Sequence, residues 1–276
     1  MENENVFASL NDGKLKVIAP LLESIVREKG EYGEDYARGL NYLLAITEKF
    51  NSSGFQDSYA IIGGFAVFAH MYSLLEERTL TEWRGSVDLD VMAKHRSIDT
   101  LIGNSFEEVE RIITHFKDKS TLYVKDEIEL IRELEYGKSL KSPLKIDIYI
   151  PENGRFIEFN YVILEDEFWD RTESINVLGY GIRVAGLTDM LKFKLDVEID
   201  SSGLPRTRDI TDIYNLMGIA EIKGVTAKKV YDSLTEKQRL KLRKLILMHN
   251  FEGAPHEEVR IEPSPDYLQE YSRLVK

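Results

Sequence analysis

Apolar and polar residues follow two different periods along the chain, and each change of period marks a predicted part of the fold. Over residues 15–25 and 36–50, apolar residues recur every three or four positions, which is the spacing of an amphipathic helix. Pro20 interrupts the first set, and the glycines within 30–33 separate the two sets. Residues 1–55 are therefore predicted to form a helical N-terminal cap with no chemistry of its own.

Strand and helix patterns alternate from residue 56 to residue 185. The apolar run at 59–62 predicts a short strand that ends in two glycines, and an apolar stripe of helical period begins after Gly64. The next strand is predicted at 87–93, where apolar residues alternate with aspartates. A capped start at Ser105, followed by apolar residues at helical spacing up to Phe116, predicts a helix. The remaining predicted elements of this part are strands at 120–124, 127–134, 144–150 and 156–164, and a hairpin of 175–178 and 182–184.

The pattern becomes helical again from Leu187 to the C-terminus. A loop is expected at 201–205, where serines, a glycine and a proline cluster. The predicted fold class is therefore α+β: a mixed β-sheet core at 56–185 lies between the helical cap at 1–55 and an all-helical C-terminal domain at 186–276. Helices of the last part are predicted to begin at Thr188 and Arg206 and to cover 226–233, 236–249 and 267–274.

The length and composition are those of an ordinary globular protein. With 276 residues, of which 43% are hydrophobic and 30% charged, the chain can bury the core of one large or two modest domains. No apolar run approaches the roughly 18 residues that a membrane span needs, and the acidic N-terminus is unlike a secretory signal. The absence of cysteine excludes disulfides and cysteine-bound zinc. These features predict a cytoplasmic protein with no membrane partner.

The net charge of −12 argues against a protein that coats nucleic acid, because an acidic protein is a poor non-specific binder of polyanions. A nucleic-acid substrate held by a local basic patch remains compatible with this charge. The favoured interpretation of the candidate patch is the solvated face of an amphipathic helix. The patch consists of Lys228, Lys229, Lys237, Arg239, Lys241, Arg243 and Lys244.

The candidate chemistry is carried by three aspartates and a glycine pair. Asp88 and Asp90 lie two positions apart on a predicted strand, so both point to one face, about 6.7 Å apart along the strand. Asp147 lies between apolar residues on a later strand. Gly63 and Gly64 stand where a strand meets a helix, and such glycines let a backbone approach a phosphate closely. Three carboxylates on neighbouring strands can hold two divalent cations, for which Mg²⁺ or Mn²⁺ is the simplest choice.

This order of features resembles the DNA polymerase β-like nucleotidyltransferase superfamily, in which a glycine pair precedes a helix and Asp-x-Asp follows on the next strand. Within it, the spacing is similar to AbiEii-type abortive-infection toxins and related minimal nucleotidyltransferases. The resemblance covers about residues 59–216, and the N-terminal cap and the tail lie outside it. The segments that carry it are Gly63-Gly64, Arg84-Gly85-Ser86-Val87-Asp88-Leu89-Asp90, the lysine-bearing segment 187–195 and Arg208-Asp209-Ile210-Thr211-Asp212.

The resemblance implies a role for each matching residue. Asp88 and Asp90 would bind both metal ions, and Asp147 would be the third ligand and help to deprotonate the attacking hydroxyl. Gly63, Gly64 and Ser86 would line the triphosphate. Arg84 would hold either the Asp-x-Asp strand or the nucleotide, although a plain surface arginine is an equal interpretation. Glu127 and Glu129 also share one face of a predicted strand and are the alternative to Asp147 as third ligand.

Lys194 is predicted to point inward, because it shares a helical face with apolar neighbours. A buried lysine needs a partner, and either a phosphate or Asp209 would serve. The resemblance assigns Lys194 and Asp209 to nucleotide binding; a lysine that reaches solvent from an amphipathic helix is the competing interpretation. Asp209 and Asp212 are equally compatible with a charge pair near a helix N-terminus. His70 is predicted to be a hydrogen-bonded core histidine.

The resemblance implies an enzyme that transfers a nucleoside monophosphate from an NTP to a hydroxyl and releases pyrophosphate. The implied acceptor is RNA such as tRNA, or a protein, and the implied biological role is the toxin of a toxin–antitoxin pair with an antitoxin as partner. Two alternatives stay open. One is a non-catalytic nucleotide-binding scaffold, and the other is an aminoglycoside- or lincosamide-modifying enzyme, whose cationic substrate an acidic cleft would suit.

Overall fold

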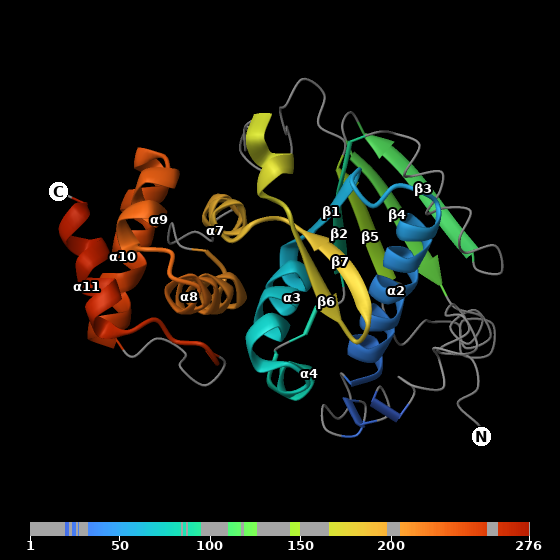
Figure 1. The fold of residues 1–276 in the computed structure, drawn as a ribbon, viewed down its shortest axis with the longest axis horizontal. Helices are drawn as coiled ribbons and strands as arrows, with labels where there is room; N and C mark the ends of the chain where they lie inside the picture. The colour runs from blue at the N-terminus through green and yellow to red at the C-terminus, as the bar shows by residue number, and fades with distance from the viewer. Residues whose placement is uncertain are drawn as a thin grey trace. The chain divides into compact units, whose positions relative to one another are not determined.

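The backbone of the computed structural model divides into two compact units (Figure 1). The first is made of residues 1–65, 85–152 and 174–184, and the second of residues 66–84, 153–173 and 185–276. The predicted domain boundaries at 55/56 and 185/186 stay a prediction. The structure describes residues 20–21, 24–25, 27, 33–83, 85–86, 88–94, 110–116, 119–125, 144–149, 166–197, 205–252 and 259–275.

A mixed sheet forms the centre of the first unit. Its described strands are β1 (Tyr59–Ile62), β2 (Asp88–Ala93), β3 (Glu110–Phe116), β4 (Lys119–Lys125), β5 (Leu144–Tyr149), β6 (Glu173–Val177) and β7 (Tyr180–Val184). Their order across the sheet is β3-β4-β5-β2-β1-β7-β6. In the middle, β2 runs parallel to β5 and antiparallel to β1. The predictions of strands at 59–62, 87–93, 120–124 and 144–150 and of the hairpin near 175–184 are confirmed.

Helix α2 (Gly33–Ser52) contacts β2 and β7 of this sheet. Its apolar stripe is buried, and the ring of Phe50 lies 4.3 Å from the ring of Tyr59 on β1. The second helical set of the N-terminal cap is therefore confirmed. The first set, at 15–25, lies mostly outside the described residues, as do the predicted strands at 127–134 and 156–164.

The helix predicted up to Phe116 is wrong over its described part, because residues 110–116 form strand β3. Every residue of β3 is paired antiparallel with β4, from Glu110 opposite Lys125 to Phe116 opposite Lys119. The β-branched run Ile112-Ile113-Thr114 favours an extended backbone. The apolar spacing of this segment fits a helix as well as a strand, and pairing with β4 selects the strand.

The second unit is helical in its described part. It contains the short η2 (Asp166–Arg171) and most of α3 (Gly63–Leu75), whose first residues belong to the first unit. The all-helical pattern predicted from Leu187 onward is confirmed, and the fold class is α+β as predicted. None of the helices that the structure describes has the combination of length and apolarity needed to cross a membrane. The other helices of this unit are α4 (Arg78–Glu82), α7 (Leu187–Asp196), α8 (Thr207–Ile222), α9 (Ala227–Ser233), α10 (Glu236–Glu252) and α11 (Pro265–Leu274).

Candidate active site

Gly63 makes the turn from β1 into α3 directly beside Asp90. The last residue of β1, Ile62, lies opposite Asp90 on β2, and Gly63 has a φ of +66°. A Cβ atom at Gly63 would lie 2.1 Å from Oδ2 of Asp90 and 2.9 Å from its Cγ. Only glycine meets both requirements, a left-handed backbone and no side chain against the carboxylate. The predicted glycine turn at a strand-to-helix junction is confirmed.

Asp88 and Asp90 share one face of β2, as their spacing predicted. Both are half-buried. Leu89, which lies between them, and Val91, which follows Asp90, are fully buried on the other face. Asp147 lies on the neighbouring strand β5, directly opposite Asp90 in the parallel ladder. Residues opposite one another in a ladder occupy the same face of the sheet. The three aspartates therefore occupy adjacent positions on one face; the side chain of Asp147 lies outside the described set.

The turn that leads into β2 packs on α2. Gly85 has a φ of +94°, and a Cβ there would lie 2.5 Å from the ring of Tyr36. A Cβ at Gly39 of α2 would lie 3.1 Å from the carbonyl oxygen of Ser86. The Ser86 hydroxyl donates to the carbonyl of Asp88 at 3.1 Å. The N-terminal cap, to which the sequence assigned no chemistry, thus fixes the turn before the aspartates. Arg84, Glu127 and Glu129 lie outside the described residues.

The residues beside the Gly63 turn fit a hard divalent cation. Carboxylate oxygens are the ligands that Mg²⁺ and Mn²⁺ prefer. The first turn of α3 adds N–H groups without helical partners and the positive end of the helix dipole, which suit a phosphate. Among the side chains that the structure describes, no three His, Asp or Glu groups lie close enough to hold a metal ion. Asp88 and Asp90 supply two described carboxylates, and Asp147 supplies the third position by register.

Lys194, which was also predicted to contact the nucleotide, lies in the second unit. Two aspartates of α8 form ion pairs with it. Its Nζ lies 3.0 Å from Oδ1 of Asp209 and 2.6 Å from Oδ2 of Asp212. The Asp209 carboxylate is fully buried and also accepts from Nε of Arg206 at 2.6 Å. Burial raises the pKa of Asp209, but the neighbouring charges of Lys194 and Arg206 outweigh burial and hold that pKa below its usual range.

The inward orientation of Lys194 is confirmed, and of the two partners that the sequence left open, the structure supplies the carboxylate. Asp209 and Asp212 share one lysine of α7, because Lys194 forms an ion pair with each of them. A contact of Lys194 or Asp209 with a nucleotide stays a prediction. Arg206, which sequence reasoning missed, had a signal, because it precedes Asp209 by three residues on one helical face.

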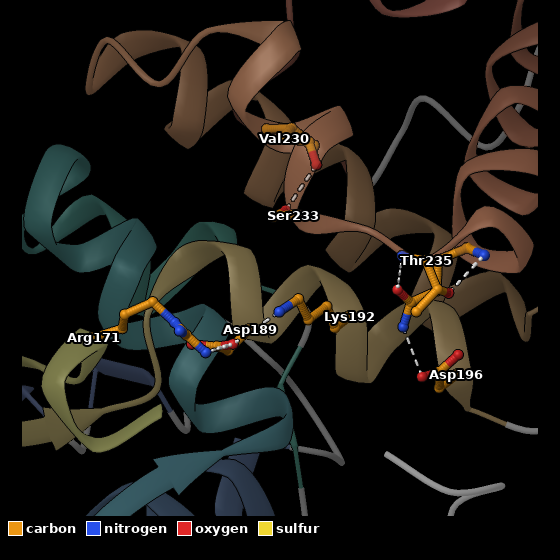
Figure 2. Close-up of polar contacts among 8 residues, drawn as sticks. Arg171, Asp189, Lys192, Asp196, Val230, Ser233 and Thr235 are labelled. Carbon is orange, nitrogen blue, oxygen red and sulfur yellow. Dashed lines mark hydrogen bonds and ion pairs between the residues drawn. The ribbon is translucent and has the colours of Figure 1, made fainter. Parts of the chain in front are cut away.

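Both ends of α7 are fixed by polar contacts, which Figure 2 shows. At the start, Arg171 makes a bidentate pair with Asp189 at 2.8 Å for each of its two bonds, and Nζ of Lys192 lies 3.6 Å from the same carboxylate. At the end, Gln238 donates to Asp196 at 2.7 Å. The position of Lys194 is therefore set by a helix that is anchored at both termini. Arg171 gave no sequence signal, because it lies outside the helix.

His70 is a hydrogen-bonded core histidine, as predicted. It lies on α3 and is fully buried, with Nε2 2.8 Å from the carbonyl oxygen of Ala185. Burial lowers the pKa of His70 to about 4, although the bond to Ala185 and the charge of Glu173 act in the opposite direction. The ring is therefore neutral at physiological pH. A neutral, buried ring in this position fits a residue that packs in the core, and it gives no support for a catalytic role.

No protein-family model matches the chain, and no curated protein matches it.

Proposed function

We propose that the chain is a divalent-metal-dependent nucleotidyltransferase, which moves a nucleoside monophosphate from an NTP to a hydroxyl group and releases pyrophosphate. The observation that supports this most strongly is the register of the sheet. Asp90 lies opposite Ile62 on one side and opposite Asp147 on the other, so the aspartates and the Gly63 turn fall at one point. Paired carboxylates with no cation between them repel each other, which is a cost that a metal ion removes.

Asp88, Asp90 and Asp147 would hold the metal ions. When bound, such ions neutralise the triphosphate and stabilise the leaving pyrophosphate. In the reaction, the hydroxyl oxygen forms a bond to the α-phosphorus, and the bond from that phosphorus to the bridging β-phosphate oxygen breaks. Pyrophosphate leaves with the electron pair, and the hydroxyl proton passes to the Asp147 carboxylate. The N–H groups in the first turn of α3 would bind the triphosphate, where negative charge develops.

The acceptor that we propose is a hydroxyl of RNA, such as tRNA, or of a protein. In this scheme the chain is the toxin of a toxin–antitoxin pair and an antitoxin is its partner. The Lys194 charge is already compensated by Asp209 and Asp212. A phosphate contact by Lys194 would therefore need one of these carboxylates to be released or protonated.

The test is incubation with each labelled NTP, Mg²⁺ and either total tRNA or a panel of proteins. Asp88→Ala/Asp90→Ala removes two proposed ligands, and Asp57→Ala removes an exposed aspartate of the same unit that pairs with Arg183. We expect label transfer by the wild type and by Asp57→Ala, and none by the double variant. Transfer that survives in the double variant would place the chemistry elsewhere. Absence of transfer in every case would favour a scaffold, and transfer only to an added aminoglycoside or lincosamide would favour the drug-modifying alternative.

A further inference from the structure

Helix α10 exposes two leucines at the centre of its outward face. Leu240 is 52% exposed and Leu247 is 42% exposed, whereas Leu242, Leu245 and Ile246 on the opposite face are buried. The buried face contacts α7 and α11, and the carbonyl of Leu245 accepts the hydroxyl of Tyr214 on α8. The helix is therefore already packed on one side within its own unit (Figure 1). The two leucines on the other side leave about half of their surface exposed.

The outward leucines are spaced as in a coiled-coil seam. Leu240 and Leu247 are seven residues apart, and Lys237 and Lys244 complete a 3-4-3 spacing along the same face. This is the spacing at which one helix presents side chains to another. A solvated helical face normally carries polar residues at these positions, whereas this face has two half-exposed leucines at its centre.

The charges on this face are positive in a protein whose net charge is −12. Lys237 and Lys244 are exposed and make no ion pair with another described residue. Other members of the basic patch are used internally: Lys228 pairs with Asp232, and Lys241 donates to the carbonyl of Leu195. The two exposed lysines thus border the leucines, and the charge of Lys237 also acts to lower the pKa of Asp196 at the end of α7.

From these observations we propose that the outward face of α10 binds an acidic amphipathic helix of a partner protein. The partner's apolar residues cover Leu240 and Leu247, and its carboxylates meet Lys237 and Lys244. A second copy of the chain fits less well, because it would set these lysines against one another. Nucleic acid also fits less well, because the centre of the face is apolar. This docking surface is independent of the proposed enzymatic activity.

The test uses the full chain and synthetic helical peptides, with binding measured by fluorescence anisotropy. The probe peptide carries leucines at coiled-coil spacing flanked by glutamates; a second peptide replaces the glutamates by lysines. The variants are Leu240→Ser/Leu247→Ser and Lys237→Glu/Lys244→Glu. Ile222→Ser is the control, since Ile222 is a more exposed apolar residue, at 63%, on another helix.

We expect the glutamate peptide to bind the wild type and Ile222→Ser equally, and each double variant to raise the dissociation constant by about ten-fold or more. Three results would overturn the proposal. The first is no binding of the glutamate peptide, or equal binding of the lysine peptide. The second is a wild-type dimer in sedimentation that Leu240→Ser/Leu247→Ser dissociates, which would make the face a self-association surface. The third is binding of tRNA that depends on the lysines and not on the leucines.

Discussion

Replacing Gly63 by alanine tests the turn on which the proposed site depends. The substitution has two effects that can be separated. It forces a non-glycine residue to a φ of +66°, and it places a methyl group 2.1 Å from the nearer Asp90 oxygen. The first effect costs about 1–2 kcal/mol. The second costs about 1–3 kcal/mol more, because the methyl group also lies 2.9 Å from Cγ of Asp90 and the whole carboxylate must move.

Gly54→Ala is the matched control. Gly54 has a φ of +77°, and a Cβ there meets nothing within 4 Å. Both variants share the backbone strain and the reduced entropy of the unfolded chain, so their difference isolates the contact with Asp90. In urea unfolding followed by circular dichroism, Gly63→Ala is expected to be about 1–3 kcal/mol less stable than Gly54→Ala.

The same displacement of Asp90 should lower label transfer from NTP by about 100-fold, the usual effect of moving a reacting group by 1 Å. Gly54→Ala should retain wild-type transfer. If Gly63→Ala and Gly54→Ala had equal stability, the close approach of Gly63 to Asp90 would be refuted. If Gly63→Ala were destabilised but transferred label normally, Asp90 would have no place in the chemistry.

Three further predictions concern the second unit. Lys194→Met removes the buried charge that pairs with Asp209 and Asp212 and should cost about 3 kcal/mol or more in urea unfolding, whereas Lys228→Met, which removes an exposed ion pair with Asp232, should cost about 1 kcal/mol or less; equal costs would contradict the buried triad. His70 has a pKa of about 4 in the folded chain, below the 6.5 of the unfolded chain, so stability is fully present above pH 6.5 and falls as the pH drops toward 4, by about 3 kcal/mol at most. Unfolding of His70→Gln as a function of pH should lack this component, and an unchanged pH profile would argue against burial of the ring. Oδ1 of Asn215 accepts the backbone N–H groups of Arg260 and Ile261 at 2.9 and 3.0 Å, so Asn215→Ala should cost about 1–3 kcal/mol. Asn176→Ala, which removes one exposed acceptor, should cost less than that, and the reverse order would refute the assignment.

Local patterns in the sequence were sufficient to predict the strand, the turn and the inward lysine discussed as parts of the candidate site. The alternation Asp88-Leu89-Asp90-Val91 predicted which side chains share a face, because the period of a strand is fixed by its geometry. The glycine pair predicted the turn, because few residues adopt a positive φ. The inward position of Lys194 followed from its apolar neighbours on the helix.

Features set by contacts between distant segments were not predictable in this way. Strand β3 carries an apolar spacing that fits a helix as well as a strand, and its pairing with β4 decides the matter. The pairing of Arg171 with Asp189 joins residues 18 positions apart, and the packing of Gly39 against Ser86 joins α2 to a later turn. Neither contact leaves a local pattern in the sequence. The register of β2 and β5, which sets Asp147 opposite Asp90, is also a tertiary result.

The most direct test of the account is a titration of Mn²⁺ in the presence of a non-hydrolysable NTP analogue, followed by electron paramagnetic resonance. The variants are Asp88→Asn, Asp90→Asn and Asp147→Asn, with Asp57→Asn as the control. We predict that each of the three weakens Mn²⁺ binding by about ten-fold or more and that the control binds like the wild type. Wild-type affinity in Asp147→Asn, or no nucleotide-dependent Mn²⁺ binding by the wild type, would contradict the account.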